Sequence, residues 1–99
     1  MYSVEQSETF NTWLHELRDS VARVRIAARI SMAKEGNLGD CASVGGGVHE
    51  MRVHVGPGYR LYFMKRGQRV IFLLLGGDKS SQSHDIKRAK VMAKDIDED

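Results

Sequence analysis

Four basic side chains stand close to the ends of apolar segments in the second half of the sequence. They are Arg52, His54, Arg60 and Lys79. A guanidinium can donate two parallel hydrogen bonds to phosphate oxygens, and an imidazole can exchange protons near neutral pH. These residue types therefore suit the recognition and cleavage of a phosphodiester, although each one could also simply solvate an exposed face.

The stretch LLLGGDKSSQ at 73–82 raises a second phosphate chemistry, that of a nucleotide-binding loop. Such a loop needs an earlier glycine at a fixed distance, so that successive backbone amides surround the phosphates. Here that position lies in a hydrophobic run with no glycine. The sequence therefore argues against a nucleotide-binding role for Lys79.

The histidines and the cysteine show no metal-binding or nucleophile pattern. His49 and His54 stand at an odd offset on one predicted strand, so they point to opposite faces. Cys41 is the only cysteine, which rules out an internal disulfide and suits a reducing cytoplasm. The sequence thus predicts neither a metal nor a cofactor.

The charge is distributed unevenly along the 99 residues. Residues 1–48 and 91–99 carry a small excess of acid, whereas residues 49–90 hold nine Lys and Arg against three Asp and Glu. A basic middle of this kind is typical of a surface that binds a polyanion. No apolar run approaches the roughly 20 residues that span a bilayer, so no membrane association is expected.

The elements around these side chains follow the order β-α-α-β-β-β-α. We predict strands at 2–6, 48–55, 59–65 and 70–75, and helices after Ser7, at 21–35 and after 80–83. Short turns make the three later strands antiparallel neighbours. The expected fold is a single α+β domain over 1–99, with a helical hairpin packed on a small, mostly antiparallel, twisted sheet and the helices on one face.

Three further expectations concern individual segments. In the second helix, the spacing of Val21, Val24, Ala28 and Met32 predicts the buried stripe, with Ile26 and Ile30 on its flank. Residues 38–47 are expected to be a loop, which the glycines at 45–47 make flexible. The acidic residues 95–99 are expected to be a frayed tail.

Three stretches resemble one known family. GYRLYF at 58–63, LLLGGDKSSQ at 73–82 and DIKRAK at 85–90 are similar to the HigB-like branch of the RelE/ParE toxin superfamily, also described as addiction-module killer proteins. The resemblance extends from Glu8 to Lys94. It implies a RelE-like fold and a toxin of a type II toxin–antitoxin pair that cleaves mRNA without a metal.

The resemblance also implies the roles of the basic residues. Arg60 matches the arginine of the family's Gly-Tyr-Arg motif, and Lys79 matches a basic residue beyond the last strand. Arg52 and His54 stand where RelE-type enzymes have two lysines, and His54 is our candidate general base. The family's C-terminal tyrosine is missing, so His84 is the candidate general acid.

Three more residues complete the predicted RNA-binding surface. Glu50 shares a strand face with Arg52 and His54 and can orient either of them, Tyr62 can stack on a base, and Lys65 is placed on the same RNA-binding surface.

The implied partners are mRNA, usually on the ribosome, and an antitoxin with a helix-turn-helix encoded beside the toxin. Arg18, Arg25 and Arg29 share a helical face that would either contact the antitoxin or be solvated. One alternative is a ParE-like inhibitor that binds DNA gyrase without RNA cleavage, and another is a non-catalytic interaction domain of phage origin.

Overall fold

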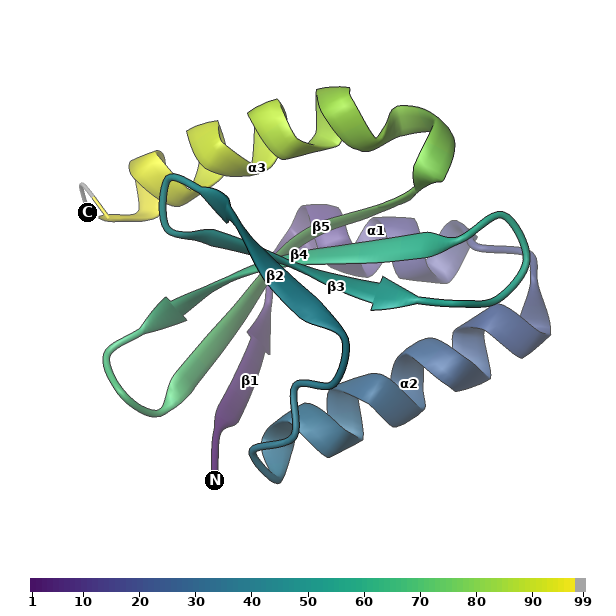
Figure 1. The fold of residues 1–99 in the computed structure, drawn as a ribbon, viewed down its shortest axis with the longest axis horizontal. Coiled ribbons are helices and arrows are strands. Elements are labelled where there is room, and N and C mark those ends of the chain that lie inside the picture. The colour runs from purple at the N-terminus through teal and green to yellow at the C-terminus, as the bar shows by residue number, and fades with distance from the viewer. Residues whose placement is uncertain (98–99) are drawn as a thin grey trace.

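A single five-stranded mixed sheet forms the centre of the computed structural model, which describes residues 1–97 (Figure 1). The strand order is β1-β5-β4-β3-β2, in which β1 pairs with β5 in parallel and all other neighbours are antiparallel. In chain order the elements are β1 (Ser3–Gln6), α1 (Glu8–Glu16), α2 (Ser20–Lys34), β2 (Cys41–Gly45), β3 (Val48–Val53), β4 (Tyr59–Arg66), β5 (Val70–Asp78), a short 3-10 helix η1 (Lys79–Ser81) and α3 (Gln82–Asp97).

The helices cover both faces of the sheet, not one face as expected. Phe10 of α1 and Ile26 of α2 pack with Leu61 in one core, whereas α3 packs on the other face over Tyr62 and Leu75. Figure 1 shows α3 on the side of the sheet opposite α2. The reason lies in β4 and β5, which are apolar on both faces and therefore need cover on both. The α+β class is confirmed, and the arrangement has three layers.

The helix boundaries follow the local signals. The Ser7 hydroxyl accepts a hydrogen bond from the Phe10 backbone N–H at 2.9 Å and caps α1, and the Asp19 carboxylate does the same for Ala22 at the start of α2. Gly36, with φ of 93°, follows the end of α2 in the left-handed region. The caps therefore hold the two helices where the sequence placed them.

The prediction of which residues of α2 are buried is wrong. Ala22, Ile26, Ile30 and Ala33 face the core, whereas Val21, Val24, Ala28 and Met32 face solvent. Both sets have helical spacing, and the larger branched side chains of Ile26 and Ile30 decide which one is buried. The helix consequently leaves an apolar row uncovered.

The segment expected to be a loop contains the edge strand β2. It pairs with β3, and Gly46 and Gly47 form the tight turn between the two strands, with φ of 62° and 78°. Left-handed residues at both turn positions match the twist of a two-residue hairpin. The glycines thus define a hairpin and not a flexible loop.

Strand β5 runs through both glycines of LLLGGDKSSQ to Asp78 and contains a bulge at Leu74. A Cβ at Gly76 would lie 2.4 Å from the ring of Trp13, and a Cβ at Gly77 would lie 2.0 Å from Oδ2 of Asp85. The two glycines therefore let α1 and α3 approach the strand from opposite sides. Their role here is close packing, and no phosphate loop forms.

The C-terminal segment is helical for longer than expected. Helix α3 continues to Asp97, so the prediction of a frayed tail is wrong for residues 95–97. The rest of that predicted tail, residues 98 and 99, lies outside the described residues. None of the helices within 1–97 combines the length and the apolar character that a membrane crossing requires.

Candidate active site

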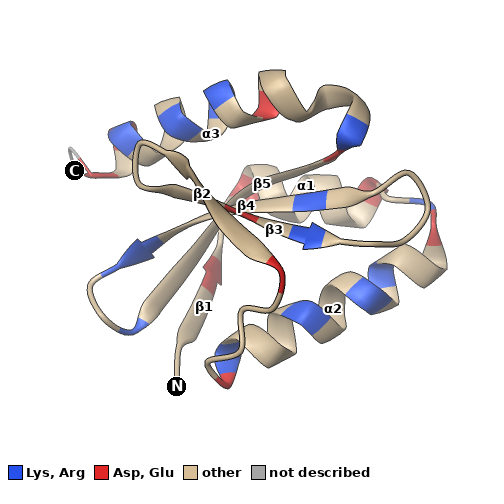
Figure 2. Cartoon of the chain, in the orientation of Figure 1, with Lys and Arg blue, Asp and Glu red and all other residues tan. Residues whose placement is uncertain are grey.

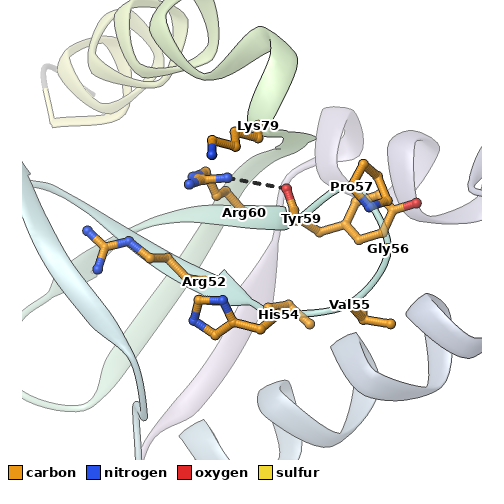
Figure 3. A pocket seen from close by; sticks show the side chains of 10 residues that line it. Arg52, His54, Val55, Gly56, Pro57, Tyr59, Arg60 and Lys79 are labelled. Atoms are coloured by element: carbon orange, nitrogen blue, oxygen red, sulfur yellow. Dashed lines mark hydrogen bonds between the residues drawn. The ribbon is translucent and has the colours of Figure 1, made fainter.

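Four of the five predicted catalytic side chains line one open pocket of about 450 Å³. These are Arg52, His54, Arg60 and Lys79, and the turn 55–58 completes the wall. Figure 3 shows Arg60 and Lys79 next to each other, with Arg52 and His54 on the neighbouring strand. The pocket lies at the end of the sheet where β3 turns into β4.

Strand register explains this convergence. Arg52 is paired directly with Arg60 across β3 and β4, and Arg60 is paired with Gly77 of β5, two residues before Lys79. Antiparallel pairing across the short turn at 56–58 brings the end of β3 to the start of β4. The bulge at Leu74 then sets which residue of β5 lies beside Arg60.

A buried carboxylate lies close to both arginines. Glu50 is 1% exposed, and its Oε1 accepts a hydrogen bond from Nε of Arg52 at 3.0 Å and lies 3.6 Å from Nε of Arg60. The other oxygen of Glu50 accepts a hydrogen bond from the Gln82 amide at 2.9 Å. Directly opposed cations would repel each other on neighbouring strands, and Glu50 between them removes that cost. The hydrogen bond to Glu50 also raises the pKa of Arg52.

Asp40 forms a second link on the outer side of the pocket. Its Oδ2 lies 2.5 Å from Nε2 of His54, and its Oδ1 lies 3.2 Å from Nη1 of Arg52. The hydrogen bond to His54 holds the pKa of Asp40 below its ordinary value, so this group is a carboxylate at neutral pH. In the neutral tautomer whose Nε2 donates to Asp40, the lone pair of Nδ1 is free. His54 itself is 74% exposed and open to a ligand.

An arginine of α2 fixes the loop that carries Asp40. Nη2 of Arg29 donates to the carbonyl of Leu38 at 3.0 Å, and Nη1 donates to the carbonyl of Arg52. Gly39 allows this approach because a Cβ there would lie 2.7 Å from Nη2 of Arg29. Arg29 is therefore not available on an exposed helical face, and that part of the prediction is wrong. Arg18 and Arg25 are exposed.

The charge that faces the pocket comes chiefly from Arg60 and Lys79. The Arg60 side chain is 13% exposed, and its Nη1 donates to the carbonyl of Gly58 at 3.3 Å. Lys79 is exposed and forms no ion pair with any residue of 1–97. Arg60 and Lys79 lie side by side (Figure 3). The single negative charge of Glu50 is shared between Arg52 and Arg60, so this side of the pocket suits an anion.

Three other predicted site residues lie elsewhere. Tyr62 is fully buried beneath α3, so the prediction that it stacks on a base is wrong. His84 is exposed on the first turn of α3 and does not line the pocket, and Lys65 is exposed near the far end of β4. His84 is consequently not among the side chains that this pocket brings together.

Beneath the pocket, polar groups are buried between the sheet and α3. The buried Asp85 accepts a hydrogen bond from the Ser81 hydroxyl at 2.6 Å, and the Tyr62 hydroxyl has no hydrogen-bond partner among the described residues. Burial, together with the nearby Glu50 and Asp85, raises the pKa of Tyr62. This face of the sheet thus holds a polar layer that supports Glu50 and the start of α3.

Sequence reasoning missed three residues of the site, namely Asp40, Gln82 and Arg29. Each lies far along the chain from the residue it contacts. The signal that could have found Asp40 is its place in a glycine-containing segment just before a strand. Within residues 1–97 no three His, Cys, Asp or Glu side chains gather as ligands for a metal ion.

The fold and the pocket define an α+β protein with a basic cleft at one end of its sheet. The chain matches no known family profile. It is 41% identical over 93 residues to an uncharacterized protein of Haemophilus influenzae (strain Rd), with 94% of each chain covered. The chain therefore belongs to the same family as this Haemophilus protein.

Proposed function

We propose that this protein is a RelE-like toxin of the HigB branch, which cleaves mRNA in the cytoplasm without a metal ion and so arrests translation. The observation that carries the proposal is the meeting of Arg52, His54, Arg60 and Lys79 in one open pocket. The strand order and the two helices before the hairpin are compatible with the RelE-like fold that the sequence resembles.

The reaction begins with His54. Nδ1, which has a free lone pair, accepts the proton of a ribose 2′-hydroxyl while Asp40 fixes the ring through Nε2. The 2′-oxygen then attacks the adjacent phosphorus and forms a pentacoordinate phosphorane. DNA lacks this hydroxyl and is not a substrate.

The arginines stabilise the charge that this attack creates. Arg60 lies close to the buried Glu50 and donates a hydrogen bond to the carbonyl of Gly58. Its Nη1 and Nη2 nitrogens donate to the phosphate oxygens, and Arg52 adds positive charge from the neighbouring strand. The bond to the 5′-oxygen breaks, and Lys79 donates the proton that this oxygen takes up. The products are a 2′,3′-cyclic phosphate and a 5′-hydroxyl end.

The test compares Arg60→Ala with Arg66→Ala, which removes an exposed arginine from the far end of the same strand. We expect Arg60→Ala to lower RNA cleavage by about 10²-fold and to abolish growth arrest, because it removes the main charge at the phosphate. Arg66→Ala should retain both. Circular dichroism of both variants verifies that they fold.

A second substrate sharpens this test. An RNA with one 2′-deoxy nucleotide at the cleaved position should resist cleavage at that bond. Full toxicity of Arg60→Ala would overturn the assignment, and inhibition of gyrase supercoiling by wild-type protein with intact transcripts would establish the ParE-like alternative. The proposed partners are the ribosome and an antitoxin encoded beside this protein.

A further inference from the structure

Helix α2 has two apolar faces, and the structure covers only one. The uncovered row, which we call the α2 stripe, consists of Val21, Val24, Ala28 and Met32. The exposed fractions are 57% for Val21, 70% for Val24 and 40% for Met32. Residues at these spacings lie in a line almost parallel to the helix axis. A straight apolar row of this kind fits another helix laid along it.

Two shallow hollows border the α2 stripe. One, of about 420 Å³, lies between α1 and α2 and is lined by Leu14, Val24 and Ala27 among others. The second, of about 270 Å³, lies at Val21, Val24 and Arg25. Hollows beside an apolar row accept the side chains of a helix packed against it.

The charge around the α2 stripe has one sign. Residues 20–34 include Arg23, Arg25, Arg29 and Lys34 and contain no Asp or Glu. Figure 2 shows the basic segments of α2 with acidic residues only near its ends. Arg23 lines the larger hollow and Arg25 the smaller one, and neither forms an ion pair within the described part of the chain. A complementary surface must therefore be acidic.

Other occupants fit less well. A second copy related by a two-fold axis would bring the same arginines together and repel. An anionic membrane selects basic helices with Trp, Phe or Leu on the apolar side, whereas this row has Val, Ala and Met. The remaining occupant is an acidic amphipathic segment of another protein.

We propose that the α2 stripe binds an acidic amphipathic helix of a partner protein, with its apolar side on Val21, Val24 and Met32 and its carboxylates on Arg23 and Arg25. This surface lies on α2, which covers the sheet face opposite Glu50, Arg52 and Arg60. The inference goes beyond the proposed nuclease and does not depend on it.

The experiment uses the full chain and a synthetic acidic peptide of about 16 residues, long enough to span α2. The peptide has leucines at the spacing of the α2 stripe and glutamates on both flanks, and binding is followed by fluorescence anisotropy. Val24→Glu should weaken binding by about tenfold or more, because it places a charge in the centre of the contact. The control Val91→Glu changes a residue of α3 that is 61% exposed, and it should bind like wild type.

A charge swap completes the test. A peptide with lysines in place of the glutamates should bind poorly to wild type and gain affinity for the double variant Arg23→Glu, Arg25→Glu. Absence of binding by the acidic peptide would overturn the proposal, and so would equal binding of both peptides. It would also be overturned by dimerisation in analytical ultracentrifugation that Val24→Glu abolishes, or by Val24-dependent binding to phosphatidylglycerol vesicles.

Discussion

The two faces of the sheet differ in what they bury. Among the described residues, the face under α1 and α2 buries no charged side chain, and its core includes Phe10, Ile26 and Leu61. The face under α3 buries Glu50, Asp85 and the hydroxyl of Tyr62 along with its apolar residues. Buried polar groups contribute little net stability but fix geometry. The comparison indicates that one face holds the fold together and the other holds the pocket side chains in position.

The largest expected effect tests the apolar face. Phe10→Ala should lower the free energy of unfolding by about 3–5 kcal/mol, because it leaves a cavity under α1. Val24→Ala, on the uncovered side of α2, should change it by less than about 0.5 kcal/mol. Urea denaturation measures both. Similar losses in the two variants would contradict the contrast between the buried core under α1 and the exposed row of α2.

The glycines of β5 allow a closer comparison of the two faces. Gly77→Ala should cost about 1–3 kcal/mol and slow RNA cleavage, because the new methyl group pushes Asp85 and the start of α3 away from the pocket. Gly76→Ala displaces the half-buried ring of Trp13 on the other face and should retain cleavage. Thermal unfolding and a cleavage assay of both variants separate stability from activity. Equal loss of RNA cleavage in Gly76→Ala and Gly77→Ala would contradict the different roles of the two sheet faces.

The smallest effect concerns Tyr62. Its pKa is raised in the folded protein, so the stability it contributes is fully present below its unfolded pKa of about 10 and is lost as pH rises above that value. Tyr62→Phe should change stability at neutral pH by no more than about 1 kcal/mol and should reduce the alkaline decline. Urea midpoints measured at neutral and alkaline pH test this. An unchanged alkaline decline would count against the burial of this hydroxyl.

Local patterns predicted most of the fold. The helix after Ser7, the helix predicted at 21–35 and the strand predicted at 48–55 need only neighbours in sequence, and the structure has each of them with small shifts at the ends. Strand β2 was missed because CASVG is short and half-exposed, and only its pairing with β3 makes it a strand. The two apolar rows of α2 have the same spacing, so periodicity alone could not say which one the sheet would cover.

The sequence was sufficient to predict the basic residues of the candidate site, but not the residues that hold them in position. Arg52 and Arg60 lie on strands joined by a short turn, which fixes their proximity. The contacts of Asp40 and Gln82 depend on how a loop and a helix pack over the sheet, and no sequence pattern specifies that. His84 lies in the first turn of α3 and is not among the residues that line the pocket, and its place likewise depends on how that helix packs over the sheet.

The bulge at Leu74 acts as a spacer in β5. It takes up one residue between the pairs Phe63 with Leu73 and Tyr62 with Leu75, and the hydroxyl of Ser7 donates to the carbonyl of Leu74 at 2.5 Å. If β5 paired without interruption, Lys79 would move along the strand by about 3.3 Å relative to Arg60. Gly77 would then turn toward Trp13, and Asp85 would meet a different residue. The one unpaired residue, Leu74, thus sets the register of β5, so that the residues before it and those after it each face their observed partners.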